Sequence, residues 1–131
     1  MDDSVKSFLE QHHGAVQATI KPDGQPHMVR IGVGLVDGKL WSSGTQDRVR
    51  TGYLRRDPRS TLFVFGAGPQ DWLGLETTVA ILEGADAPEL NLRLYQQLRG
   101  DPDNIEEYLE AMVDEQRLIY EFEIVRSYGQ F

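Results

Sequence analysis

Residues 15–43 of the chain, AVQATIKPDGQPHMVRIGVGLVDGKLWSS, contain three runs typical of β-strands with a turn signal between each pair. The first run alternates apolar and polar side chains, as a half-buried strand does. The sequence PDGQP predicts a turn with Gly24 at positive φ. Asp37-Gly38 is the dipeptide of a two-residue hairpin loop. We therefore predict a β-meander with strands over residues 15–21, 27–35 and 39–43.

The rest of the chain mixes helices with further strands. We expect Ser4 to cap the first helix and Asp47 the second, which Asp57-Pro58 ends because a residue before proline disfavours helical geometry. A doubly wound parallel sheet would alternate strand and helix from the start, and this chain does not. The prediction is an α+β fold, a six-stranded antiparallel barrel with peripheral helices. The expected helices cover 4–13, 48–56, 88–99 and 104–116, and the other strands cover 60–65, 72–83 and 118–125.

Length and composition set the class of protein. With 131 residues, the chain is predicted to form one domain over residues 1–131. It has no cysteine, which excludes disulfides and thiolate chemistry. No apolar run approaches the ~20 residues of a membrane span, and the N-terminus is acidic where a signal peptide would be basic. We expect a soluble cytoplasmic protein that does not bind a membrane.

The formal net charge is −8, which disfavours a nucleic-acid partner. The charge is unevenly distributed. Residues 101–123 hold nine acidic residues and a single base, Arg117. Five of the 13 basic residues lie between positions 48 and 59, opposed there only by Asp57: Arg48, Arg50, Arg55, Arg56 and Arg59. An acidic protein with one concentrated arginine segment indicates a small anionic ligand.

Residues 42–51, SSGTQDRVRT, are the candidate binding segment. A strand leads there into hydroxyl residues, a glycine and the start of an arginine-bearing helix. Backbone N–H groups at a helix start favour an anion, and arginine binds phosphate in a bidentate way. The alternative is a surface helix with solvated arginines. No catalytic nucleophile is recognisable and only three histidines are present, so we expect no metal site and expect any chemistry to come from a cofactor.

Four segments in order along the chain carry a resemblance: ATIKPDGQP (18–26), RVRTGYLRRDPR (48–59), AILEG (80–84) and SYG (127–129). In these the chain resembles the flavin and deazaflavin split β-barrel proteins related to pyridoxamine 5′-phosphate oxidase. It is most similar to their mycobacterial and actinobacterial branch, which uses coenzyme F420. The segment ending in LRRDPR is the most specific of the four.

The resemblance implies a homodimer with two cofactors at its interface, each touched by both chains. It implies that the residues of the helix after the third strand hold the cofactor phosphate, that the strand after the first turn lies along the ring, and that the partner chain lends an aromatic side chain. Lysine is frequent in the family where this chain has Arg50, and asparagine or glutamine where it has Tyr53. The implied cofactor-binding residues are His27, Met28, Val29, Arg30, Ser43, Arg48, Arg50, Thr51 and Trp72.

The implied activity is hydride transfer from reduced F420 to an organic acceptor such as a quinone, a tetrapyrrole or an enone. Two alternatives remain open: an FMN-dependent oxidase or reductase of the same fold, and a non-catalytic carrier of F420 or a flavin. F420 carries a polyglutamate tail besides its phosphate and so needs more positive charge along its path. Arg55, Arg56 and Arg59 are the candidates for contacts with that tail.

Overall fold

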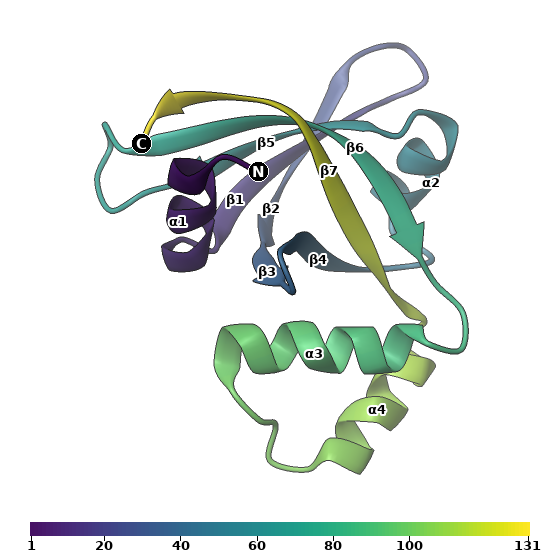
Figure 1. Ribbon diagram of the computed structural model, residues 1–131. Helices are drawn as coiled ribbons and strands as arrows, with labels where there is room; N and C mark the ends of the chain where they lie inside the picture. Colours follow the sequence, from purple (N-terminus) through teal and green to yellow (C-terminus); the bar gives the residue numbers. More distant parts are fainter.

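The computed structural model describes residues 1–131 as a curled antiparallel sheet with four helices around it (Figure 1). The predicted α+β barrel fold is confirmed. The elements in chain order are α1 (Asp3–Gln11), β1 (Gly14–Ile20), β2 (Pro26–Gly32), β3 (Gly34–Val36), β4 (Lys39–Thr45), α2 (Val49–Arg56), β5 (Arg59–Phe65), β6 (Trp72–Leu82), α3 (Ala87–Arg99), α4 (Ile105–Asp114) and β7 (Arg117–Gln130).

The sheet has seven strands where the sequence predicts six, because the expected strand over 27–35 is two strands. The break falls at Val33, whose backbone N–H donates to the carbonyl of His13, 2.8 Å away, one residue beyond the end of the β1–β2 ladder. Before the break β2 pairs with β1, and after it β3 pairs with β4. The chain therefore changes partner strands at this point without a long loop.

The strand order is β2-β1-β5-β6-β7-β4-β3, so β2 lies at one edge of the sheet. The long strand β7 pairs with both β6 and β4 and extends beyond the predicted 118–125. The inner face holds one large apolar cluster that includes Leu62, Leu75 and Tyr120. Polar side chains are buried among the strands as well: Gln17 and Thr19 of β1 are both at most 1% exposed.

Helices α3 and α4 pack together below the sheet in the view of Figure 1, with α3 against β3, β4 and β7. A second, smaller apolar cluster joins α3 to the sheet through Leu94, Trp41 and Ile119. The side chain of Asn104 caps α4 by accepting a hydrogen bond from the backbone N–H of Glu107. Helix α1 is capped by Asp2 and not by Ser4, which lies inside the helix. None of the four helices is long and apolar enough to cross a membrane.

The Asp37-Gly38 turn between β3 and β4 allows a test of the hairpin geometry. Both residues have positive φ, 50° and 77°, as a two-residue hairpin loop requires. Gly38→Ala is expected to destabilise the protein by about 1 kcal/mol, because a side chain is strained in the left-handed region.

Gly52→Ala is the matched control, since Gly52 lies inside α2 and a Cβ would meet nothing within 4 Å at either position. It should be neutral or stabilise by about 0.4–1 kcal/mol. Denaturant unfolding measures both variants, and an equal effect of the two would contradict the assigned turn.

Candidate functional site

A cleft of ≈ 660 Å³ opens between the edge strand β2, the end of β4, the start of α2 and the start of β7. Both chain segments that the sequence singled out by charge reach it: the arginine segment and Arg117 of the acidic segment. The nine lining residues are His27, Val29, Thr45, Asp47, Arg48, Val49, Arg50, Glu115 and Arg117. Three arginines against two carboxylates make this cleft cationic in a protein of net charge −8.

The start of α2 has no side-chain cap. The prediction that Asp47 caps it is wrong: the carboxylate of Asp47 accepts a hydrogen bond from the hydroxyl of Thr45, 2.6 Å away, and the N-cap position falls to Arg48. That hydrogen bond lowers the pKa of Asp47 and keeps it ionised. The first-turn N–H groups of α2 that the helix leaves unpaired are therefore not satisfied by a side chain of their own segment.

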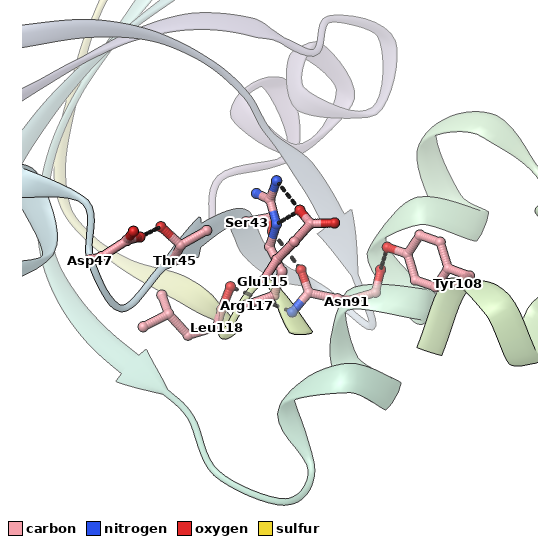
Figure 2. Close-up of polar contacts among 8 residues, drawn as sticks. All are labelled: Ser43, Thr45, Asp47, Asn91, Tyr108, Glu115, Arg117 and Leu118. Atoms are coloured by element: carbon pink, nitrogen blue, oxygen red, sulfur yellow. Dashed lines mark hydrogen bonds and ion pairs between the residues drawn. The ribbon is translucent and has the colours of Figure 1, made fainter. Parts of the chain in front are cut away.

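Arg48 and Arg50 form no ion pair in the chain, whereas Arg117 bonds to Glu115 at 2.8 Å (Figure 2). Arg50 is partly buried, with its guanidinium carbon 5.4 Å from the centre of the Tyr120 ring. Burial lowers the pKa of Arg50, yet arginine starts so far above neutrality that the group stays cationic. Its Nε is buried without a hydrogen-bond partner. The cleft thus presents two cations with free donors.

Another part of the cleft wall comes from β2. His27 and Val29 face the cleft because alternate residues of a strand share one face. The His27 ring packs edge-on against Tyr53 of α2, with 5.5 Å between ring centres. Its Nδ1 is buried and has no partner in the chain. Strand β2 therefore contributes one apolar side chain, Val29, and one aromatic ring, His27, to a cleft that also contains arginines.

Four of the nine predicted cofactor-binding residues line the cleft: His27, Val29, Arg48 and Arg50. Thr51 is fully buried, and Ser43 does not line the cleft; the hydroxyl of Ser43 donates a hydrogen bond to Asn91 of α3 (Figure 2). Their direct contact with a cofactor stays a prediction.

The other three predicted residues lie on the outer face of the sheet. Met28 and Arg30 point away from the cleft on β2, and the guanidinium of Arg30 lies over the Phe65 ring. Trp72 stacks on Phe63 with 5.2 Å between ring centres and 11° between planes. We call Met28, Phe63, Phe65, Trp72 and Tyr128 the outer aromatic patch. All of its members are at least partly exposed.

The remaining arginines of the segment have partners within the chain. Arg55 forms two 2.8 Å hydrogen bonds with Glu83, which lower the pKa of that carboxyl. Arg56 donates to the carbonyl of Ile20, and Arg59 bonds to Asp57 and holds its pKa at about 2. None of these three arginines lines the cleft. Their contact with a polyglutamate tail stays a prediction.

Five lining residues were not among the predicted site residues: Thr45, Asp47, Val49, Glu115 and Arg117. Arg117 could have been singled out from the sequence, because it is the only base among nine acids over residues 101–123. It reaches the cleft because Arg117 pairs with Thr45 where β7 runs beside β4. That contact joins residues far apart in the sequence and follows only from the order of the strands.

Comparison with known proteins gives the family context. A family model described as pyridoxamine 5′-phosphate oxidase matches residues 1–130. Among solved structures, a conserved hypothetical protein from Mycobacterium tuberculosis superposes with a TM-score of 0.79 at 24% identity, covering 97% of this chain and 82% of that one. An F420 reductase superposes with a TM-score of 0.77 at 19% identity, covering 99% and 100%. A heme storage protein from Vibrio cholerae superposes with a TM-score of 0.71 at 12% identity, covering 98% and 93%.

The cationic cleft predicts anion binding that requires no ring system. Inorganic pyrophosphate at ten times its dissociation constant should stabilise the protein by about 1.4 kcal/mol and raise Tm by about 4–7 °C. The double variant Arg48→Ala/Arg50→Ala should lose this rise. Arg99→Ala, an exposed arginine at the end of α3, should keep it. Thermal scans with and without pyrophosphate are the measurement, and an unchanged rise in the double variant would place the anion elsewhere.

Proposed function

Because this chain belongs to the pyridoxamine 5′-phosphate oxidase family, we propose that its cleft binds a phosphate-bearing flavin-type cofactor, coenzyme F420 first of all, and that the protein is an oxidoreductase. The observation that carries the proposal is the pair of arginines without ion pairs, Arg48 and Arg50, at the uncapped start of α2. A phosphate group matches that set of donors in charge and in hydrogen-bonding capacity.

The residues present fit such a cofactor. Two polar atoms of the cleft wall, Nε of Arg50 and Nδ1 of His27, are buried without partners, and buried polar groups are ordinarily paired. Arg48 and Arg50 would hold the phosphate. Val29 and the ring of His27, which packs edge-on against Tyr53, would border the flat ring system. The cleft volume of ≈ 660 Å³ lies within the usual range for ligand sites.

A bound deazaflavin or flavin supplies hydride transfer, and no residue of the chain is needed as a nucleophile. The work of the chain is binding and orientation. The arginines neutralise the phosphate, and Val29 reduces the access of water to one side of the cleft. Glu115 keeps Arg117 oriented beside the same cleft. The acceptor class, proposed from the family resemblance, is a quinone, a tetrapyrrole or an enone.

The choice of F420 over FMN rests on the resemblance of the arginine segment and on the likeness to an F420 reductase. Of the arginines proposed for the polyglutamate tail, Arg55 and Arg59 form ion pairs within the chain, so electrostatics favours F420 less than the sequence indicates. The fold is shared with a FAD-binding protein from Mesorhizobium loti and with the heme storage protein. FMN and a non-catalytic carrier role are therefore the second candidates.

We propose that the protein is a homodimer with the cofactor at its interface. The outer aromatic patch supplies an apolar face for a second copy, with Met28 63% and Phe65 41% exposed. Edge strand β2 joins this patch to the cleft, because Met28 and Arg30 lie on its outer face while His27 and Val29 lie on the cleft face. A second copy seated on the patch would thus border the cofactor site.

Titration with F420 and with FMN at low and high salt tests the cofactor. F420 should bind more tightly, and Arg50→Ala should weaken it about ten-fold or more, since a charge-assisted contact contributes roughly 1.5–3 kcal/mol. High salt should weaken binding in the wild type more than in the variant. Tighter binding of FMN at both salt concentrations would promote the FMN alternative. Turnover of an acceptor with the bound, reduced cofactor separates an enzyme from a carrier.

Light scattering tests the dimer, whose mass should be twice the 14.8 kDa of one chain. Phe63→Asp should shift the protein toward a monomer, because it places a charge in the outer aromatic patch. Val113→Asp is the control, since Val113 is a 62% exposed apolar residue on α4, far from the patch in the fold. A wild-type monomer at micromolar concentration would contradict the proposal.

A further inference from the structure

We propose that Tyr120 is a positioning residue that fixes the Arg50 guanidinium at the cleft. The inference rests on the proposed function, in which Arg50 binds the anionic group of the ligand. Tyr120 itself is fully buried and does not line the cleft. It can therefore affect the ligand only through another residue.

The contact between the two side chains is a cation–π interaction. The guanidinium carbon of Arg50 lies 5.4 Å from the centre of the Tyr120 ring, within the range of such contacts. No ion pair or hydrogen bond within the chain holds the Arg50 side chain, and its Nε is buried without a partner. The cation–π contact with the Tyr120 ring is therefore the one identified interaction that orients the Arg50 guanidinium.

The tyrosine ring is itself fixed by its hydroxyl. Thr51 Oγ1 donates its only proton to the carbonyl of Thr45, 2.7 Å away. The hydroxyl of Tyr120, 2.5 Å from Thr51 Oγ1, must therefore be the donor in that second bond. This relay connects Tyr120 to Thr51 and on to the backbone of Thr45. It uses the hydroxyl of Thr51 inside the chain and ties the ring to two elements that border the cleft, α2 and β4.

A glycine provides the room for the ring. A Cβ at Gly44 would lie 2.4 Å from atoms of the Tyr120 ring, closer than carbon atoms approach in proteins. The ring leans across β4 at Gly44, one residue from Thr45 and within the β4–β7 pairing. Four residues from three elements, Gly44, Thr45, Thr51 and Tyr120, therefore form one rigid support under Arg50.

Such a support matters for affinity because an unrestrained arginine loses side-chain entropy when a ligand fixes it. A guanidinium already held over an aromatic ring loses less. Arg48, by contrast, is exposed and has no aromatic neighbour of this kind. Arg50 is consequently the preorganised member of the pair.

A double-mutant cycle on F420 binding tests the proposal, with the dissociation constant measured by calorimetry. Tyr120→Leu should weaken binding about three- to ten-fold when Arg50 is present. In the Arg50→Ala background the same change should have no further effect, because the residue through which Tyr120 acts is gone. Phe122→Leu, a similarly buried ring on β7, is the matched control and should leave affinity unchanged.

An equal loss from Tyr120→Leu in both backgrounds, or no loss in either, would overturn the positioning role. A wild-type affinity for F420 in Arg50→Ala would instead reject the proposed function. Should Tyr120→Leu fail to fold, Tyr120→Phe and Thr51→Val carry the test, because each breaks the hydroxyl relay while keeping the ring. Each should lower affinity about two-fold or more and only when Arg50 is present, and unchanged affinity in both would contradict the inference.

Discussion

The pairing of β7 holds this molecule together. It forms a ladder of eleven residue pairs with β6 and a ladder of six with β4. Without β7 the sheet would separate into β2-β1-β5-β6 and β4-β3, because no other strand pairs with a strand of each group. The same strand brings Arg117 beside Thr45 and places Tyr120 below Arg50. The closure of the sheet and the assembly of the cationic cleft are thus consequences of one set of backbone hydrogen bonds.

Two glycines allow β7 to carry large rings on both faces of that sheet. Gly44 accepts the ring of Tyr120 on the inner side, and Gly74 accepts the ring of Tyr128, since a Cβ at either glycine would lie 2.4 Å from the ring. Tyr128 then meets Trp72 edge-on, with 6.0 Å between ring centres, in the outer aromatic patch. An aromatic ring laid over a glycine restores the apolar cover that a residue without a side chain cannot give. The Gly44–Tyr120 pair supports the proposed anion site, and the Gly74–Tyr128 pair supports the proposed subunit contact.

Local signals in the sequence predicted most of the secondary structure, including the Asp37-Gly38 hairpin, because that turn depends only on neighbouring residues. The Asp47 cap failed for a competing local reason, since Thr45 offers its hydroxyl two residues away. The arginine segment shows more clearly what local sequence patterns cannot predict. Its charge indicates one site, yet Arg55 is neutralised by Glu83, which lies 28 residues further along the chain. Which arginines remain free is decided by tertiary contacts that no local pattern encodes.

Strand β2 finally gives the cleft and the outer aromatic patch a physical connection. Its edge position leaves one side unpaired, and its period of two sends His27 and Val29 to the cleft but Met28 and Arg30 to the patch. Binding that fixes β2 on one face lowers the conformational entropy that is still lost when a partner binds the other face. In the proposed dimer, cofactor binding and subunit association would therefore be linked, and thermodynamic reciprocity requires that each strengthen the other by the same factor. A cofactor site at the edge of a sheet gains from dimerisation in this way even where the partner supplies no hydrogen bond to the ligand.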